Sequence, residues 1–392
     1  MLQQLEGSQA VARAVGLCRP GVVCAYPITP QTHIVEDLGN LVRSGELQNC
    51  DFLNVESEMA AISVTIGSQA AGVRSYTATS SQGLLYMIEG VYNASGLELP
   101  LVVTLGNRAI GAPINIWNDH SDAMAMRDAG WIMLFAETNQ EAVDLHIQAF
   151  KIAEETSIPV MVCVDGFILT HAYERVDLPS QEEVDDFLPI YNPRICLDPE
   201  NPIAIGTMVP PEYFMELKYG AHVAQKKAYH VIDRIGTEFQ KKFKRDSGGL
   251  IRTYGAKKAK NIIITLGSVA GTIKDVVDEL GDEFGVISII SYRPFPADAL
   301  ANAVQDAENI IVVEKALAPG IGGILVGEVE LALRSMHLNV RSVIAGLGGR
   351  MITKTMLIDC ILMNNGPREM FLGLEPQLCC DDSMAREKFT GK

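Results

Sequence analysis

The sequence has few basic residues and no long apolar run. Lys and Arg together number 32 against 48 for Asp and Glu, which gives a formal net charge of -16. A protein that binds the phosphates of a nucleic acid or an anionic membrane surface needs a broad basic face. The longest apolar stretches, such as 99–105 and 262–266, are far shorter than the roughly 20 residues that cross a bilayer. We therefore expect no nucleic acid and no membrane among its partners.

The spacing of the cysteines also excludes a class of site. The 8 cysteines contain no CxxC pair and no run with zinc or iron–sulfur spacing; they lie at 18, 24, 50, 163, 196, 360, 379 and 380. We expect free, mostly buried thiols in a reducing compartment. Residues 1–9 have no basic segment followed by an apolar run, so we expect no secretory signal and a cytoplasmic location. Any iron–sulfur cluster that works with this chain must belong to another chain.

The apolar pattern predicts two α/β domains. The chain has 392 residues, 48% of them hydrophobic, and single cores rarely grow beyond about 250 to 300 residues. From residue 7 to 170, short apolar runs alternate with segments of helical periodicity, and the alternation restarts at Asn261. This order is typical of a parallel sheet covered by helices on both faces. A Ser-Gly-Gly break at 247–249 marks the expected boundary, giving domains 1–248 and 249–392.

One long segment of the first domain, about 177–245, is predicted to lie outside its sheet. Residues 177–215 are rich in Pro and acidic side chains and have weak periodicity. Residues 224–245 are charged and are expected to form a helix. In the second domain, the glycines at 320, 322 and 323 lack the Lys-Ser/Thr pair of a P-loop, so close helix packing is the simpler explanation for that turn.

Two polar side chains are expected at the carboxyl ends of strands, where ligands bind in open α/β sheets. The first follows the strand near residue 25, in the loop Tyr26-Pro27-Ile28-Thr29-Pro30, whose prolines fix the backbone. This loop is either a rigid connection or a place where Thr29 offers its hydroxyl to a small oxygen-rich substrate. The second is Arg108, directly after the strand 99–104, which either pairs with a surface acid or binds a carboxylate through two parallel hydrogen bonds.

Two helix starts carry further candidates. Glu58 opens a helix predicted over 58–71, where it either complements the helix dipole or acts as an acid–base group, because its small apolar neighbours disfavour the ionised form. The hydroxyls of 77–81 precede a helix predicted over 82–95 and are expected to cap it, with the lining of a cofactor pocket as the alternative. The segment Asn118 to Asp122 has metal-ligand residue types in an incomplete set, so turn hydrogen bonds are expected there.

Taken together, these segments resemble the alpha subunit of the 2-oxoacid:ferredoxin oxidoreductases, and within that family pyruvate:ferredoxin oxidoreductase. The resemblance rests on ordered motifs over most of the chain: 26–30 (YPITP), 56–60 (ESEMA), 79–83 (TSSQG), 107–110 (NRAI), Asp119-His120 with Asp122, Arg127-Asp128 before Gly130-Trp131, 165–171 (DGFILTH), 291–296 (SYRPFP) and 313–315 (VEK).

The resemblance implies a fold and an activity. It implies that the first domain binds the aminopyrimidine of thiamine diphosphate and that the second is a transketolase C-terminal-like α/β domain. The implied reaction of anaerobic metabolism converts pyruvate to acetyl-CoA and CO2, or the reverse, with coenzyme A taking the acyl group and ferredoxin taking the electrons. Another 2-oxoacid, such as 2-oxoisovalerate or 2-oxoglutarate, is an open alternative, and so is a non-catalytic scaffold subunit.

The resemblance also assigns roles to residues. It implies that Glu58 hydrogen-bonds the pyrimidine ring nitrogen and helps to activate the cofactor. Thr29 and Arg108 match substrate contacts, with Arg108 binding the 2-oxoacid carboxylate. Four more residues are implied as cofactor contacts: Pro27, Ile28, Ser81 and Gln82.

Half of the implied cofactor site is missing from the sequence. Thiamine diphosphate enzymes hold the diphosphate and Mg²⁺ with a Gly-Asp-Gly segment and a later Asn, and the nearest string here, Val164-Asp165-Gly166, lacks both the leading Gly and the Asn. We therefore expect no metal site for the cofactor in this chain. A beta subunit would supply the Mg²⁺ and diphosphate contacts, and ferredoxin-like gamma and delta subunits would accompany it, with 4Fe–4S clusters on the partner subunits.

Overall fold

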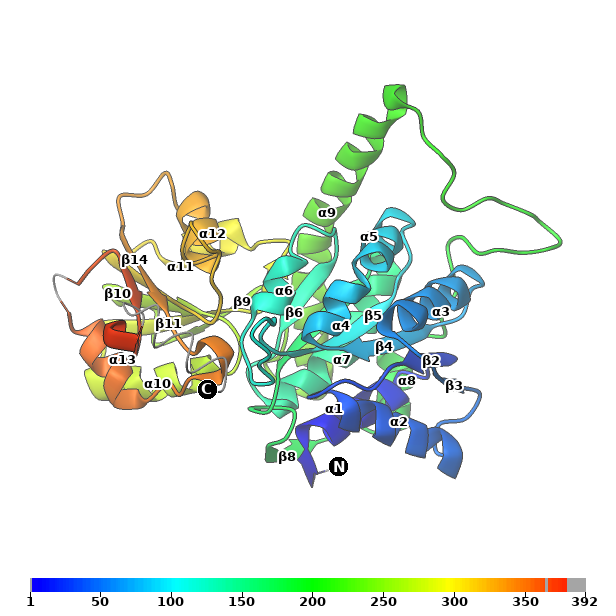
Figure 1. Cartoon of the computed structure of the whole chain (residues 1–392), viewed down its shortest axis with the longest axis horizontal. Helices are drawn as coiled ribbons and strands as arrows, with labels where there is room; N and C mark the ends of the chain where they lie inside the picture. Colours follow the sequence, from blue (N-terminus) through cyan, green and yellow to red (C-terminus); the bar gives the residue numbers. More distant parts are fainter. Residues whose placement is uncertain (1, 364–365, 379–392) are drawn as a thin grey trace.

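The computed structural model describes residues 2–363 and 366–378, which form two largely parallel sheets covered by helices (Figure 1). The larger sheet has the strand order β12-β6-β7-β5-β4-β2-β3, and the smaller one has the order β15-β14-β13-β10-β11-β9. A separate antiparallel pair joins β1 (Leu2–Glu6) to β8 (Tyr173–Asp177). The α/β class and its two sheets agree with the prediction.

Six strands of the larger sheet are parallel: β2 (Val22–Ala25), β3 (Asp51–Asn54), β4 (Ser75–Thr79), β5 (Val102–Asn107), β6 (Ile132–Phe135) and β7 (Val160–Asp165). One face is covered by α1 (Gly7–Leu17), α2 (Thr32–Ser44), α7 (Asn139–Thr156), α8 (Gln181–Phe187) and α9 (Pro211–Phe243). The other face is covered by α3 (Glu58–Ala70), α4 (Ser81–Tyr86), α5 (Ile88–Gly96) and α6 (Ser121–Ala125).

Strand β7 is a continuous apolar run in the sequence because both faces of the sheet are buried at this strand. Val160, Val162 and Val164 pack into the core under α1 and α7, whereas Met161 and Cys163 pack into the core on the opposite face. Successive side chains of a strand point to opposite faces, so a sheet covered on both sides needs apolar residues at every position.

The smaller sheet is built on the same rule. Its strands are β9 (Ile251–Tyr254), β10 (Asn261–Thr265), β11 (Phe284–Ile289), β13 (Asn309–Glu314), β14 (Asn339–Ile344) and β15 (Glu369–Phe371), of which β9 alone is antiparallel among the described strands of this sheet. One face carries α10 (Val269–Leu280) and α13 (Lys354–Ile361), and the other carries α11 (Ala297–Ala303) and α12 (Leu325–Ala332).

The two sheets share one core. The strand β12 (Ser291–Arg293) comes from the second half of the chain but pairs antiparallel with β6 at the edge of the larger sheet. A single buried cluster includes Met133 and Phe135 of β6 as well as Ile287 of β11 and Leu300 of α11. A boundary at 248 therefore does not separate two independent cores, because the chain returns to the first sheet at 291–293.

The segment 177–245 is more ordered than its sequence predicts. Helix α8 lies within it, and α9 begins at Pro211 rather than near 224. The later half of α9 packs on α7 and buries Ala228, Ile232, Ile235 and Phe239 in the core. Its first half projects from the body (Figure 1) and exposes Tyr213, Phe214, Met215, Leu217 and Tyr219. The segment contributes no strand to the larger sheet, and the helix expected over 224–245 is the later part of α9, which packs on the domain.

Other local predictions need smaller corrections. The helix predicted over 82–95 is two helices, α4 and α5, separated at Met87. The elements that were not predicted are strands β1, β6, β8, β9, β12 and β15 and helices α1, α6, α8 and α13. Most of these missed elements are strands of three to five residues, which are too short for a clear periodicity.

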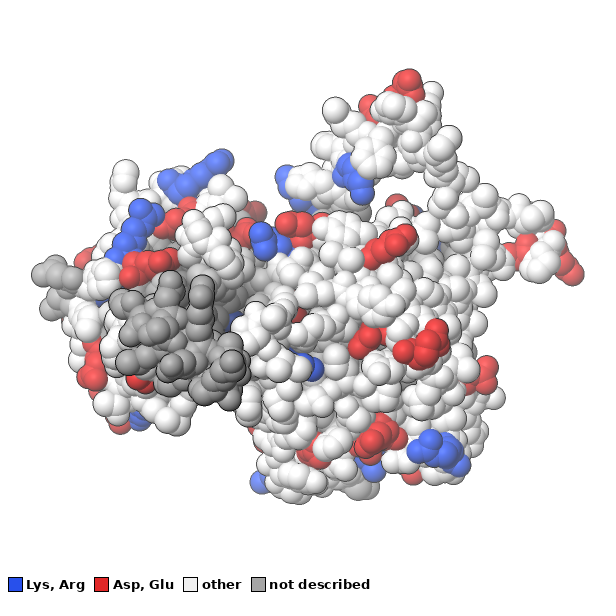
Figure 2. All heavy atoms as spheres, viewed as in Figure 1, with Lys and Arg blue, Asp and Glu red and all other residues white. Residues whose placement is uncertain are grey.

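The surface fits the charge balance of the sequence. In the view of Figure 2, acidic side chains are scattered over the molecule and basic ones form no broad face. No helix in the described part of the chain is long and apolar enough to cross a membrane. Six cysteines are free thiols, of which Cys50 and Cys196 are only partly buried. Cys379 and Cys380 lie outside the described residues.

The glycine turn at 320–323 is explained by the start of α12. The Glu314 carboxylate accepts hydrogen bonds from the backbone N–H groups of Ile324, Leu325 and Val326, at 2.7, 2.8 and 3.1 Å. A Cβ atom on Gly323 would lie 2.2 Å from Oε1 of Glu314, so no larger residue fits without displacing this carboxylate. The turn is therefore shaped at Gly323 by a carboxylate that binds the start of α12, and the expectation of close helix packing stays a prediction.

We predict that Gly323→Ala destabilises the chain by about 1 to 3 kcal/mol, because it overpacks a buried carboxylate. Gly327→Ala, four residues later and inside α12, is the control, since no atom lies within 4 Å of a Cβ there. An alanine in a helix interior is favoured over glycine by up to about 1 kcal/mol. Urea or thermal unfolding compares the two variants, and equal effects would contradict this account of the turn.

Candidate active site

Arg108 is a buried cation that has no acidic side chain as an ion-pair partner among the described residues. Only 6% of the residue is exposed, and its side chain donates from Nε to the Asn115 carbonyl and from Nη1 to the Thr29 carbonyl, both at 3.0 Å. Burial lowers the pKa of the guanidinium below its ordinary value, and the nearby charge of Asp122 opposes this. A guanidinium has five N–H donors. The two backbone contacts therefore leave donors available to an anion.

The loop after β2 lies against Arg108, as the sequence predicts. Thr29 and Pro27 are exposed and Ile28 is half-buried, while Pro30 is buried. The contact between Nη1 of Arg108 and the Thr29 carbonyl joins the carboxyl ends of β2 and β5. Thr29 is therefore an exposed residue whose backbone lies beside the guanidinium.

Ser81 and Gln82 are tied to the loop that follows β5. The Ser81 hydroxyl contacts the Ala109 carbonyl at 2.6 Å and Oε1 of Gln82 at 2.5 Å. Its backbone N–H donates to Oδ2 of Asp122 at 3.0 Å. Ser81 has a φ of 48°, in the left-handed region that residues other than glycine rarely adopt. These contacts hold a strained turn and commit the Ser81 hydroxyl to the chain itself.

Asp122 organises this turn and was not singled out as a site residue. Its carboxylate accepts from Nδ2 of Asn107 and from the backbone N–H groups of Arg108 and Ser81, each at 3.0 Å. Complete burial raises its pKa to about 7, although these hydrogen bonds lower it. The predicted turn at 118–122 is confirmed by the bond from the Ser121 N–H to Oδ1 of Asp119, at 3.0 Å.

Glu58 lies at the start of α3 with its carboxyl group turned toward α4. Ser57 caps the helix by accepting from the Ala60 N–H at 3.2 Å, so Glu58 is not the cap. Glu58 is only 7% exposed, and neither of its carboxyl oxygens has a hydrogen-bonding partner among the described residues. A Cβ on Gly83 would lie 2.7 Å from Oε1 of Glu58, so the glycine lets this carboxyl group approach α4. A buried carboxyl group without a partner is costly and marks a place for a ligand.

The hydroxyls at the end of β4 do not cap α4, so the capping prediction was wrong. The N-cap residue Ser80 makes no side-chain cap bond. The side-chain oxygens of Thr77, Thr79 and Ser80 are buried without a partner, as are Oδ1 of Asn107 and Oε1 of Gln31. Thr77 lies within β4, Thr79 and Asn107 are the last residues of β4 and β5, and Ser80 and Gln31 follow β4 and β2, so most of these atoms lie at the same edge of the sheet as Arg108. Unpaired buried polar atoms are rare in proteins, so this edge fits a polar ligand.

A buried cluster of charged and titratable side chains joins the two sheets. Asp165, the last residue of β7, contacts Nε2 of His120 at 2.6 Å and Nζ of Lys315 at 2.9 Å, and the Ser268 hydroxyl also donates to it. All three charged or titratable side chains are almost fully buried. Burial raises the pKa of the Asp165 carboxyl, but Lys315 and His120 outweigh it and hold the pKa well below its ordinary value. The motifs 119–122, 165–171 and 313–315 thus meet at one buried joint.

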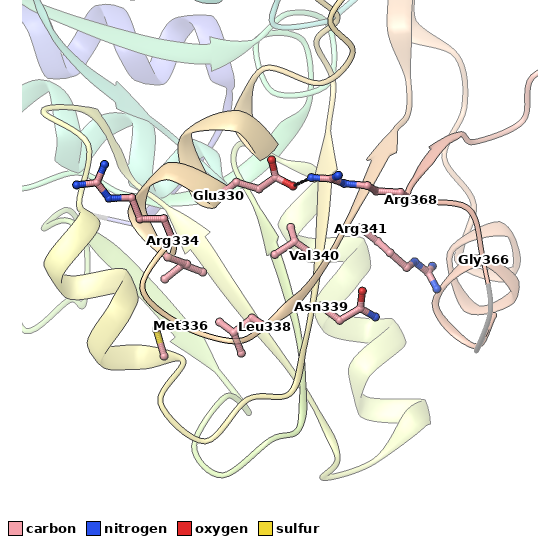
Figure 3. A pocket seen from close by; sticks show the side chains of 10 residues that line it. Glu330, Arg334, Met336, Leu338, Asn339, Val340, Arg341, Gly366 and Arg368 are labelled. Atoms are coloured by element: carbon pink, nitrogen blue, oxygen red, sulfur yellow. Dashed lines mark hydrogen bonds and ion pairs between the residues drawn. The ribbon is translucent and has the colours of Figure 1, made fainter.

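A large cavity lies elsewhere, at the amino end of β14 (Figure 3). Its volume is about 670 Å³, and Arg334, Asn339, Arg341 and Arg368 line it. Arg368 pairs with Glu330 at 2.7 Å, and Arg341 donates to the carbonyls of Cys360 and Met363. Ligands of open α/β sheets bind at the carboxyl ends of strands, so this cavity is separate from the candidate site.

Comparison with known families identifies the chain. Residues 13–236 match the family described as "Pyruvate flavodoxin/ferredoxin oxidoreductase, thiamine diP-bdg", and residues 259–357 match "Pyruvate:ferredoxin oxidoreductase core domain II". The chain belongs to the pyruvate:ferredoxin oxidoreductase family. The family assigned from the sequence motifs is thereby confirmed, together with a thiamine diphosphate-binding domain.

Curated relatives agree along nearly the whole chain. Pyruvate synthase subunit PorA of Methanosarcina barkeri is 46% identical over 354 residues, covering 88% of each chain. The subunit of the same name from Methanothermobacter thermautotrophicus is 41% identical over 96% of this chain and 99% of its own length. Ketoisovalerate oxidoreductase subunit VorA of Pyrococcus horikoshii is 39% identical over 89% of this chain and 90% of its own. The chain is therefore a PorA-type subunit of an oxidoreductase, with VorA relatives at lower identity.

One solved structure supports the fold. The 2-oxoglutarate:ferredoxin oxidoreductase from Magnetococcus marinus, solved with 2-oxoglutarate, coenzyme A and succinyl-CoA bound, matches with a TM-score of 0.69 at 20% identity. The match covers 92% of this chain and 64% of that one. At this identity the likeness concerns the fold alone.

We predict that Lys315→Met destabilises the chain by about 3 to 5 kcal/mol, because it leaves the buried Asp165 carboxylate without its principal counter-charge. Since the Asp165 pKa is lowered in the folded chain, its carboxylate stabilises the fold above pH about 4, and this contribution is lost as the pH falls further. Without Lys315, acid unfolding should therefore begin at a higher pH. Thermal unfolding between pH 3 and 8 measures both effects.

Lys260→Met is the control, because Nζ of Lys260 pairs with Glu308 at 2.9 Å on the surface, where both side chains are more than half exposed. Its thermal midpoint should remain that of the parent chain, since exposed pairs contribute little. If Lys315→Met and Lys260→Met had the same thermal midpoint, the buried contact between Lys315 and Asp165 would not stabilise the fold as proposed.

Proposed function

We propose that this chain is the alpha subunit of a thiamine diphosphate-dependent pyruvate:ferredoxin oxidoreductase that works in the cytoplasm. In the proposed reaction, pyruvate and coenzyme A give acetyl-CoA and CO2 with electrons passing to ferredoxin, or the reverse. The observation that supports this proposal most is that two unusual groups lie at the same edge of the sheet. Arg108 is a buried cation without an acidic partner, and Glu58 is a buried carboxyl group without a hydrogen bond, in each case among the described residues.

The residues at this edge fit the aminopyrimidine part of thiamine diphosphate. The free oxygens of Thr79 and Ser80 and the carboxyl group of Glu58 are buried around the start of α4. An aminopyrimidine offers ring nitrogens and an amino group to such atoms. When bound, the cofactor supplies a thiazolium carbon that adds to the 2-oxo group and accepts the electrons of decarboxylation. Pro27, Ile28, Ser81 and Gln82 remain proposed contacts, with Ser81 acting through the turn that it stabilises.

Glu58 is proposed to exchange a proton with the pyrimidine ring nitrogen. Glu58 is only 7% exposed, and the close backbone of Gly83 limits the access of water to its carboxyl group. A carboxyl group in a dry site forms a strong hydrogen bond to a ring nitrogen and can hold or release the shared proton. The side chain would therefore act as an acid–base group, and its neighbour Glu56 is exposed and has no such role.

Arg108 is proposed to bind the carboxylate of the 2-oxoacid. The Asn115 and Thr29 carbonyls fix the plane of the guanidinium, so its remaining donors are oriented before substrate arrives. Planar donors match a carboxylate through two parallel hydrogen bonds. The exposed Thr29 hydroxyl lies next to this position and is proposed to donate to a substrate oxygen.

The substrate is proposed to be pyruvate, with 2-oxoisovalerate as the second candidate. The relatives with the higher identities are called pyruvate synthase subunits, at 46% and 41%, and the ketoisovalerate oxidoreductase subunit follows at 39%. Thr29 and Arg108 contact groups that all 2-oxoacids share. They therefore do not discriminate between the two acids, and the choice rests on these identities.

The proposed complex includes other subunits. A beta subunit is proposed to supply the diphosphate and Mg²⁺ contacts, because the sequence contains no Gly-Asp-Gly segment, and ferredoxin-like gamma and delta subunits with 4Fe–4S clusters would carry electrons. Large apolar side chains near the sheet edge favour such contacts: Tyr26, Leu53, Tyr86, Ile114 and Trp117 are exposed. The exposed first half of α9 is a second proposed contact region.

Glu58→Gln should reduce turnover of the assembled complex by about 100-fold or more, the range in which acid–base groups contribute. The measurement is pyruvate-dependent reduction of ferredoxin, with size-exclusion chromatography to verify assembly. Glu56→Gln, two residues earlier and exposed, should leave the rate unchanged. A fully active Glu58→Gln complex would favour the scaffold alternative instead.

Arg108→Ala should lower kcat/KM for the 2-oxoacid by the equivalent of about 2 to 5 kcal/mol, because a desolvated carboxylate would lose its partner. Arg108→Lys should recover only part of this loss, since an ammonium group cannot make the forked contact. Steady-state kinetics with thermal unfolding as a folding control test the pair. Full recovery by lysine would exclude a two-point contact.

The substrate assignment predicts a higher kcat/KM for pyruvate than for 2-oxoisovalerate. Steady-state assays of the purified complex with each acid, at saturating coenzyme A, measure this ratio. If the branched acid is turned over equally well or better, the pyruvate assignment is wrong while the 2-oxoacid chemistry remains.

A further inference from the structure

A group of three potential metal ligands lies away from the candidate active site. The ligand atoms of Glu6, His33 and His171 all lie within 4.8 Å of one another. Glu6 ends β1, His33 belongs to the first turn of α2, and His171 lies in the turn between β7 and β8. His33 follows Glu6 by 27 positions and His171 follows His33 by 138, so no short sequence motif predicts this group.

The three side chains are close and face one another. Nδ1 of His33 lies 2.6 Å from Oε1 of Glu6, and the Glu6 side chain is only 10% exposed against 45% for His33. The ring centroids of His33 and His171 are 5.0 Å apart, with 39° between the ring planes. The buried carboxylate thus anchors the group, while solvent reaches it from the His33 side.

The ring of His171 is held in place by its neighbours. Its Nδ1 lies 2.8 Å from the hydroxyl of Thr170, which also accepts from the Phe167 N–H at 2.8 Å. The Phe167 ring packs on it with centroids 4.6 Å apart. No described residue bonds Nε2 of His171. A hydrogen bond from one ring nitrogen, with the other left free, is the usual arrangement of a metal-ligating histidine.

We propose that Glu6, His33 and His171 bind one divalent metal ion of the Zn²⁺ class. Two imidazole nitrogens and one carboxylate oxygen are a ligand set that Zn²⁺ accepts, with water in the fourth position. The exposed side of His33 gives the ion a path from solvent. The carboxylate of Asp37 on α2 has a buried oxygen without a hydrogen bond and interacts electrostatically with Glu6 and His33, so it adds negative charge that attracts a cation.

The ion would link the end of β1, the start of α2 and the turn after β7, which lie close to the Tyr26–Pro30 loop. His33 lies four residues after Thr29, and a Cβ on Gly166, at the start of the turn that carries His171, would lie 2.6 Å from the Pro30 side chain. A metal at this position would therefore restrain the start of α2 against the chain's first strand and the turn after β7. This inference is independent of the proposed function, because it concerns no substrate or cofactor contact.

The test is a titration of the full-length chain with Zn²⁺ after treatment with a chelator and gel filtration. Isothermal titration calorimetry should give one equivalent of bound Zn²⁺. His171→Ala and Glu6→Gln should each lower the affinity by more than about 100-fold, since even outer partners of metal ligands typically account for about 10- to 100-fold. His222→Ala, which removes an exposed histidine of α9, should bind as the parent chain does.

Titration with Co²⁺ identifies the ligand type without relying on activity. The proposed nitrogen and oxygen ligands predict d–d absorption without a thiolate charge-transfer band, and circular dichroism verifies that each variant is folded. The proposal is overturned by a parent chain that binds no Zn²⁺, by a folded His171→Ala chain with unchanged affinity, or by a thiolate band, which would assign the ion to cysteine.

Discussion

The buried carboxylate of Asp165 is the interaction on which the arrangement of the two sheets depends. It ends a central strand of the first sheet and is bound by Lys315 and Ser268 of the second half of the chain, as well as by His120. A buried charge is tolerated only when its partners are in place. Because these partners come from separate parts of the sequence, the carboxylate selects one relative placement of the sheets. The shared apolar core and the crossing strand β12 then fill the space around it.

The same joint leaves the Asp165 carboxylate no oxygen without an internal partner. Asp165 is the residue nearest in sequence to the metal-binding Gly-Asp-Gly pattern, yet both of its oxygens are occupied by internal partners. It cannot also coordinate an ion without releasing Lys315. The carboxyl edge of β2, β4 and β5 shows the opposite situation, with several buried polar atoms that have no partner in the described chain. At this one carboxyl edge, the carboxylate that ends β7 is thus paired internally, whereas side-chain oxygens of Thr79 and Asn107, which end β4 and β5, have no partner among the described residues.

The sequence predicted most of the long elements and the placement of Arg108 beside Thr29, because strand periodicity and the carboxyl-end rule are local or topological signals. It did not predict β12, whose three residues leave one sheet and join the other, since such pairing is decided by tertiary contacts. The hydroxyls of Thr79 and Ser80 misled the capping prediction for a related reason. Capping preferences describe isolated helix starts, whereas in the folded chain the oxygens of these two side chains are buried and make no hydrogen bond to any described residue.

The guanidinium of Arg108 has no ion-pair partner among the described residues, because different groups of one region bind the backbone and the side chain of this residue. Asp122 is the carboxylate that acts electrostatically on the guanidinium, and its oxygens accept hydrogen bonds from the N–H groups of Ser81 and Arg108 and from Asn107. With its pKa raised to about 7 by burial, it is a weak counter-charge for the guanidinium. Backbone carbonyls instead fix the direction of Arg108 without neutralising its charge. The folded chain already removes water from the guanidinium and fixes its orientation. An anionic ligand can therefore bind this cation with little further loss of hydration or reorientation.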